Sequence, residues 1–488
     1  MPQAIITRLP LEILEAICAQ LCAHCKIREA EKNALKYCPQ PPSVYLIDPD
    51  HDTMSFVNLA KTCRGLYPHA IQFAYHDLET EYWPLSKVVE FLKSLHSSPN
   101  LGKLVRCLNI EFHKYPQGSG WLFIQEQMKR LGMYEEWPLL AYWKPLLTKI
   151  ARDLDEHGNI NMWDMENMEK DDSVKRLKRS ELPWQPEQIL VDVFVNMLPN
   201  IERLEFDVTP GAVHGLFISV SAKLESLRHL RIRKFNNTYE DERGPYDLFG
   251  LKNLLEKAAN LESLEIDFSQ NTRFLSVRPL YLKNLRSLKI QDACFNLADL
   301  ENLTKQCTRL EVFTYIYDCT AWPEASGKDF KLNRLPQTLT SCRDTLQHVG
   351  IHWSPNTDDE TRDDYNDHIG SFKDFPNLKT IVLGGQSLLL ADVTKETPLE
   401  TSLVSLLPAS IEAVTLEGQH LHLYEPTLAL AKEAKEGFFP HLKTFRQSRI
   451  DPDESSDSVQ SLKEAMEESG ISLETSPDTI LRWIEIEW

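Results

Sequence analysis

A pattern of apolar positions repeats nine times from residue 200 to residue 447. Each copy approximates L-x-x-L-x-I/L, as in "NIERLEF" from Asn200, "NLESLEI" from Asn260 and "NLRSLKI" from Asn284. Alternating apolar residues are typical of a strand with one buried face. The pattern therefore predicts one short strand near each first apolar position, at 201, 227, 261, 285, 310, 346, 378, 411 and, in a degenerate copy, 442.

The copies are spaced between 24 and 36 residues apart, and this irregular spacing resembles that of leucine-rich repeats. One such unit cannot bury its own leucines, but stacked units share a continuous core. The fold class expected is therefore α/β, an irregular leucine-rich-repeat solenoid with a parallel sheet on its concave face. A buried column is predicted at Leu204, Leu230, Leu264 and Leu288.

Two further segments extend the predicted repeats. "LVRCLNIEF" from Leu104 resembles an earlier copy of the pattern. In the acidic tail, the second half of "IDPDESSDSVQSLKEAMEESG" is predicted to form a last helix before "ISLET". The pattern lapses over residues 111–195, where the sequence predicts a helical insertion.

Near the start of the chain, apolar residues recur at helical spacing after Pro10, a residue that suits the first turn of a helix. They cover about half the circumference of the predicted helix. Two interpretations remain open, namely a core helix or a helix shared between its own fold and a partner's groove. The apolar positions are Leu11, Ile13, Leu14, Ile17, Cys18, Leu21 and Cys22.

The segment "LPLEILEAICAQL" followed by "FVNLAKTCRGLYPHAIQFAYHDLE" resembles the F-box, especially that of fungal proteins. The match departs from the family at residues 26–53, an inserted loop that the compact F-box lacks. The resemblance implies a helical module over residues 1–80 that docks on the Skp protein. The Skp-binding residues that it implies are Leu9, Pro10, Leu11, Ile13, Leu14 and Ile17, with Leu59, Cys63 and Leu66 in support.

An F-box followed by leucine-rich repeats over residues 81–488 resembles the substrate receptors of Skp–cullin–F-box ubiquitin ligases. The resemblance implies a non-enzymatic adaptor whose partners are a Skp protein, through it a cullin, and a protein substrate. The alternative is a protein-binding scaffold in which the F-box-like segment merely caps the repeats.

The strand residues that alternate with the leucine column form what we call the second face of the sheet. In the first strands this face predicts a neutralising ladder of charges, made by Glu205, Arg231, Glu265 and Lys289. In the later strands it carries apolar residues and histidines, which favours either a substrate-binding surface or a face covered by the chain's own loops or tail. The candidate substrate-binding residues are Val312, Thr314, Ile316, His348 and His352.

The formal charge of −19 disfavours nucleic acid and anionic membranes as main partners. Glu12 and Glu15 interrupt the opening apolar run and argue against a secretory signal. Ten scattered cysteines without such a signal indicate reduced thiols, hence a cytoplasmic or nuclear location.

The cysteines near the start of the chain have two possible roles, namely zinc ligands or small apolar residues of a core. Cys22 and Cys25 form a C-x-x-C, with Cys18, His24 and Cys38 nearby, but no second C-x-x-C follows. Cys18 and Cys22 also fall on the apolar helix face, where cysteine acts as a small hydrophobe. The sequence therefore predicts no metal, and it shows no cofactor motif and no catalytic constellation.

Overall fold

The computed structural model describes part of the chain: residues 10–22, 25–26, 56, 58–59, 61, 66–80, 83, 85–110, 191, 194–208, 223–234, 251–267, 280, 282–291, 297–318, 332–354, 369–385, 402–417, 424–447 and 456–475. Leu9, His24, Cys38 and Cys63 lie outside these residues, as do nearly all of the insertions predicted at 26–53 and 111–195.

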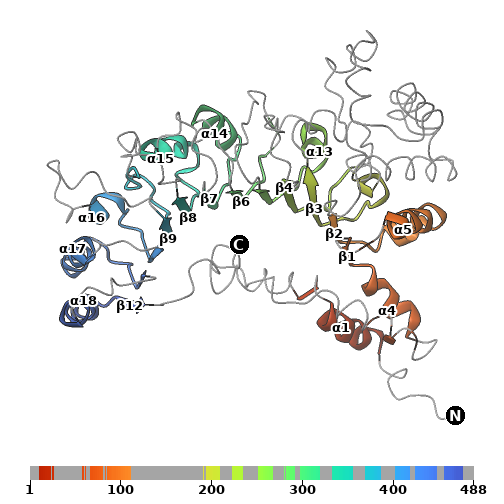
Figure 1. Ribbon diagram of the computed structural model, residues 1–488, viewed down its shortest axis with the longest axis horizontal. Coiled ribbons are helices and arrows are strands. Elements are labelled where there is room, and N and C mark those ends of the chain that lie inside the picture. The colour runs from red at the N-terminus through yellow and green to blue at the C-terminus, as the bar shows by residue number, and fades with distance from the viewer. Residues whose placement is uncertain are drawn as a thin grey trace, which may run out of the picture. The chain divides into compact units, whose positions relative to one another are not determined.

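The chain divides into two compact units. The first unit contains four parallel strands that neighbour one another in chain order (Figure 1). Its elements are α1 (Leu11–Leu21), α4 (Tyr67–Ala74), β1 (Asp77–Glu79), α5 (Leu85–Ser97), α6 (Pro99–Gly102), β2 (Cys107–Ile110), β3 (Arg203–Val208), β4 (His229–Lys234) and α13 (Lys252–Lys257).

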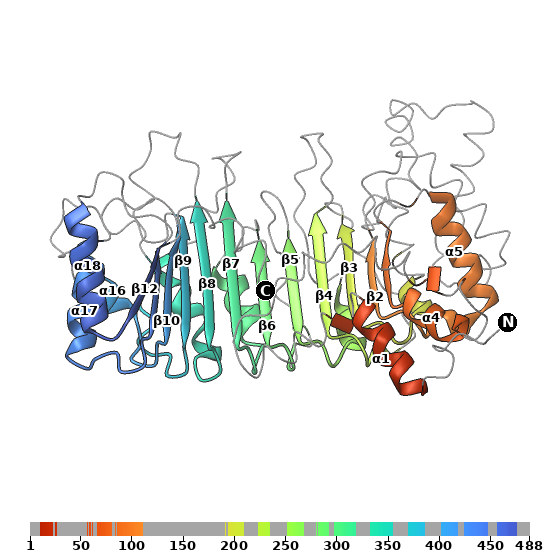
Figure 2. The same cartoon turned by 90° about the horizontal axis from the view of Figure 1, so that it is seen from below.

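The second unit contains eight parallel strands, again in chain order (Figure 2). Its helices lie on one side of these strands, as parallel crossovers require a return segment (Figure 1). Its elements are β5 (Ser263–Asp267), β6 (Ser287–Gln291), α14 (Leu297–Thr304), β7 (Val312–Asp318), η5 (Leu332–Arg334), α15 (Leu335–Thr338), η6 (Thr340–Cys342), β8 (His348–Ser354), β9 (Thr380–Gly385), α16 (Ser402–Leu406), β10 (Ala413–Glu417), α17 (Tyr424–Lys435), β11 (Thr444–Gln447), α18 (Ser456–Glu468) and β12 (Ser472–Thr475).

The predicted strands are confirmed, and both units are of the α/β class. Each strand from β3 to β11 begins two residues after its predicted first apolar position. The predicted column is buried, with Leu204, Leu230, Leu264 and Leu288 at most 1% exposed. The earlier copy from Leu104 contains β2, and the predicted tail helix is α18.

Asparagine side chains link successive turns of the chain just before several strands. The Nδ2 of Asn200 donates to the carbonyl of Lys103 at 2.8 Å. The Nδ2 of Asn260 donates to the carbonyl of Glu225 at 2.9 Å, and that of Asn377 to Asp344 at 2.7 Å. Each bond satisfies a carbonyl of the preceding turn, which explains why an asparagine precedes these apolar patterns.

Two strands were not predicted, β1 and β12. β1 lies at the end of the F-box-like segment and pairs in parallel with β2, with Leu78 opposite Leu108. Among the helices that the structure describes, none is long and apolar enough to cross a membrane.

Candidate functional site

Helix α1 buries one stripe of its apolar surface. Leu14, Cys18 and Cys22 are spaced four residues apart and are 7%, 3% and 2% exposed. Cys18 and Cys22 belong to a small core with Phe56 and Phe73, whose rings stack with centroids 6.0 Å apart. This stripe holds α1 on its own unit.

A second stripe of α1 faces solvent. Ile13 is 47% exposed and Ile17, one turn later, is 39% exposed. Pro10 is exposed at the same end of the helix. Among the residues that the structure describes, the other large exposed hydrophobic side chains are Tyr67 and Phe438. One stripe of α1 is therefore part of a core and the other is exposed, and a partner for the exposed stripe stays a prediction.

The remaining residues of the predicted Skp-binding edge are placed differently. Leu14 is buried on the same stripe as Cys18, and its role in Skp binding stays a prediction. Leu66 is buried, and Leu59 is half-buried against the core of Cys18 and Phe73. The side chain of Leu11 is not described, nor are Leu9 and Cys63.

On the second face of the first unit, polar side chains satisfy one another across the strands. Arg233 donates from Nε to Asp207 at 3.1 Å and from Nη2 to Asn109 at 2.7 Å. Arg231 lies 4.0 Å from Glu205, its neighbour in register. The predicted neutralising pairs are therefore present, and this surface is largely self-satisfied.

The second unit begins with another predicted pair. Lys289 Nζ lies 2.9 Å from Glu265 Oε1, and the two residues are in register on β6 and β5. Both side chains are mostly buried, at 10% and 16% exposed. The pair is screened less than a surface pair because water has little access to it.

The predicted substrate-binding row is much less exposed than expected. Thr314, Ile316 and His348 are 4%, 5% and 4% exposed, while Val312 and His352 are half-buried. Of the two interpretations of this row, an exposed substrate-binding surface or a covered face, the burial of these three residues favours a covered face. The residues lie in register on β7 and β8, and strands about 4.8 Å apart let adjacent side chains cover one another.

Farther along the same face, a glycine brings two ionisable side chains together. His352 on β8, Gly384 on β9 and Glu417 on β10 are in register. A Cβ at Gly384 would lie 2.4 Å from His352 Nδ1 and 3.2 Å from Glu417 Oε2. The imidazole and the carboxylate thus occupy the space that a larger residue at 384 would fill.

Burial changes the acidity of two groups on this face. It raises the pKa of the Glu417 carboxyl to about 7. It also lowers the pKa of the His348 imidazole to about 4, with a smaller contribution from the charge of Lys379. Both groups therefore favour their neutral forms at pH values where exposed counterparts are ionised.

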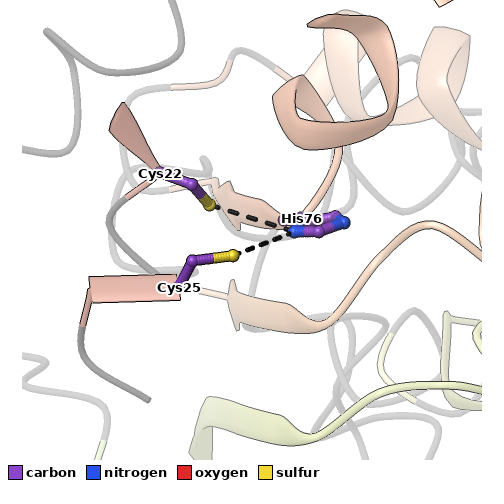
Figure 3. Close-up of side chains that lie close together, drawn as sticks. All are labelled: Cys22, Cys25 and His76. Carbon is purple, nitrogen blue, oxygen red and sulfur yellow. Dashed lines mark hydrogen bonds between the residues drawn. The ribbon is translucent and has the colours of Figure 1, made fainter. Parts of the chain in front are cut away.

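A separate cluster joins α1 to the start of the sheet (Figure 3). The Sγ atoms of Cys22 and Cys25 lie 3.9 and 3.7 Å from Nδ1 of His76. The three potential ligand atoms all lie within 4.8 Å of one another, and both cysteines are free thiols. The hydrogen bond with Cys25 and burial both raise the pKa of the Cys22 thiol.

The sequence showed only half of this cluster. The C-x-x-C of Cys22 and Cys25 was visible, but His76 lies 51 residues beyond Cys25. No local signal marked His76 as a ligand, since it stands within the F-box-like segment. Of the other residues weighed for zinc, Cys18 is buried in the small core, and His24 and Cys38 lie outside the described residues.

The chain was compared with family models and with curated protein sequences. No family model matches the chain, and no curated protein matches it in sequence. The function is therefore inferred from the exposed stripe of α1 and from the strand repeats.

Proposed function

We propose that the protein is a substrate-recognition adaptor of a Skp–cullin–F-box-type ubiquitin ligase. The F-box-like segment docks on a Skp protein, which links the chain to a cullin, and the leucine-rich repeats hold a protein substrate. The chain contributes proximity and orientation, while other subunits carry out the transfer. It needs no cofactor for this role.

The exposed stripe of α1 is the observation that carries the proposal. Fully burying an isoleucine side chain stabilises a complex by roughly 1.5–3 kcal/mol. Burying two exposed isoleucines against a partner would therefore contribute substantially to the free energy of binding. They lie four residues apart, which is the spacing with which a helix fills a partner's groove. They also fall within the residues that resemble the F-box.

The strand repeats support the substrate-binding half of the proposal. Parallel strands in register bring together side chains that are far apart in sequence, as for Ile316 and His352, which are 36 positions apart. Such stacked repeats provide long surfaces that suit protein ligands. Because Thr314, Ile316 and His348 are buried, we expect the substrate to contact other residues of the repeats.

One observation favours the second candidate, a protein-binding scaffold whose helical segment is a cap. β1 follows α4 after two residues and pairs with β2, so the F-box-like segment continues into the sheet. A cap of this kind covers the first strand whether or not it binds a partner.

Complex formation with the Skp protein of the same organism distinguishes the two. The purified chain is expected to form a stoichiometric complex on size-exclusion chromatography. Replacing both Ile13 and Ile17 by Asp should weaken this complex by at least about 30-fold, since central interface residues contribute more than about 1 kcal/mol each and about 1.4 kcal/mol corresponds to a tenfold change in Kd. Phe438→Asp is the matched control, because this side chain is 59% exposed but lies in the second unit.

The variants must first show unchanged circular dichroism. A folded double variant that binds Skp normally would refute the assigned docking stripe. A wild-type chain that forms no complex with Skp would favour the scaffold.

A further inference from the structure

The cluster of Cys22, Cys25 and His76 has the composition of a zinc site. Two thiolates and one imidazole match the sulfur and nitrogen ligands that zinc prefers, and two thiolates neutralise the charge of Zn²⁺. The chain contributes these ligands from two segments, one at the end of α1 and one directly before β1.

The distances are close to those of a bound ion. Zn–S bonds of about 2.3 Å and Zn–N bonds of about 2.0–2.1 Å at tetrahedral angles place sulfur and nitrogen about 3.6 Å apart. The observed separations from His76 Nδ1 are 3.9 Å to Cys22 and 3.7 Å to Cys25. A contraction of at most a few tenths of an ångström therefore brings the nitrogen to its coordinating distance from each sulfur, and the two sulfurs, which zinc would hold about 3.8 Å apart, lie within 4.8 Å of one another.

The backbone holds each ligand in place without the ion. Cys22 ends α1, and its carbonyl accepts the N–H of Lys26 at 3.0 Å, which folds the C-x-x-C into a turn. The carbonyl of His76 accepts two N–H groups, from Arg106 at 2.9 Å and Cys107 at 2.7 Å. The His76 ring also packs on Phe73, with centroids 4.8 Å apart. Ordered ligands reduce the entropy lost on binding.

We propose that Cys22, Cys25 and His76 bind one Zn²⁺ ion and that this ion ties α1 to the first strand. On binding, the two thiols release their protons to solvent, and the neutral imidazole coordinates through Nδ1. The fourth position of the tetrahedron is open to water.

Metal binding to the intact chain tests the proposal. The protein is stripped with a chelator under reducing conditions and titrated with Zn²⁺ against a chromophoric competitor. We expect one zinc ion per chain. Cys25→Ser and His76→Asn should each weaken binding by more than about 100-fold, because changes to residues that merely support a ligand already cost 10–100-fold. Cys342→Ser, a buried thiol of the second unit, should bind zinc like the wild type.

A measurement on the wild type avoids the risk that a variant misfolds. Co²⁺ added to the stripped chain should give the thiolate-to-cobalt charge-transfer and intense d–d bands of a tetrahedral site, and Zn²⁺ should abolish them. A folded wild type without these bands would overturn the proposal, as would zinc binding equal to that of folded Cys25→Ser. A Cys22–Cys25 disulfide that forms in air and persists when zinc is supplied would also overturn it.

The zinc proposal does not rest on the proposed function. The metal titration contains no Skp protein, so a failed Skp complex leaves the zinc result standing, and the reverse also holds.

Discussion

Glu417→Gln should make the chain more stable at pH 8 and leave it nearly unchanged at pH 4.5. Glu417 is the last residue of β10 and is only 3% exposed, and burial raises its pKa from 4.5 to about 7. Glutamine has nearly the same shape but carries no charge at either pH. The substitution therefore removes the cost of ionising a buried carboxyl.

The magnitude follows from the two pKa values. One pKa unit corresponds to 1.36 kcal/mol, so the ionised carboxyl costs the folded state on the order of 3 kcal/mol. Between pH 4.5 and 7 the folded chain binds more protons than the unfolded chain, so stability falls as the pH rises through this window. The full cost applies above about pH 7, where the variant should gain up to about 3 kcal/mol over the wild type.

Urea unfolding followed by circular dichroism at pH 4.5 and 8 measures this gain. The free energy of unfolding of the wild type is subtracted from that of the variant at each pH, and the two differences are compared. The subtraction cancels the titration of all other groups. Glu436→Gln, which replaces an exposed glutamate of the same unit, serves as the matched control. An equal effect of Glu417→Gln at both pH values, or a loss of stability at pH 8, would refute the reasoning.

Two further predictions concern the same unit. Burial, and to a smaller extent the charge of Lys379, lowers the pKa of His348 from 6.5 to about 4. Between pH 6.5 and 4 the unfolded chain therefore binds more protons at this residue than the folded chain, so the free energy of unfolding falls as the pH falls. His348→Gln should therefore gain on the order of 3 kcal/mol relative to the wild type between pH 7 and pH 4, measured by the same urea titrations. Leu264→Ala should cost about 2–5 kcal/mol, because it leaves a cavity in the leucine column, whereas Ser263→Ala on the other face should change the urea midpoint little. Equal effects of these last two substitutions would contradict the assigned faces of β5.

The strands could be predicted because their signal is local. In "NLESLEI", three apolar residues at fixed spacing specify both the strand and its buried face, and the structure places Leu264 and Ile266 in the core. Because the same pattern recurs, each repeat presents the same face to the next repeat, and the strands are predicted to run parallel. β1 escaped prediction because three residues are too few to show a period.

The burial of the second face could not be predicted in the same way. Whether Ile316 is exposed depends on His352 beside it, which belongs to a strand 36 positions later. The approach of His352 and Glu417 likewise depends on Gly384, a residue of a third strand. A sequence pattern gives the direction of a side chain along its own strand, but not the size of its cross-strand neighbours.

The cysteine cluster could be predicted only in part, because one of its residues is distant in the sequence. A C-x-x-C is visible in the sequence because its two residues are close together in the chain. His76 is distant in the chain and lies beside them because α4 packs on α1. Weighing the cysteines as apolar core residues was correct for Cys18, which has no part in the cluster. For Cys22 both descriptions hold, because its thiol is buried and also lies beside His76.

The two stripes of α1 allow stability and the proposed partner binding to be tested separately in this helix. Leu14, Cys18 and Cys22 face the unit's own core, and the thiol cluster lies at the end of that stripe. Ile13 and Ile17 point elsewhere and contribute little to that core, since they are largely exposed. If the proposed docking on Skp is right, changes to the exposed stripe should abolish it while the fold persists, whereas changes at Cys22 should act first on the attachment of α1. An apolar face that covers half of the helix is wide enough for both a core contact and the proposed docking contact.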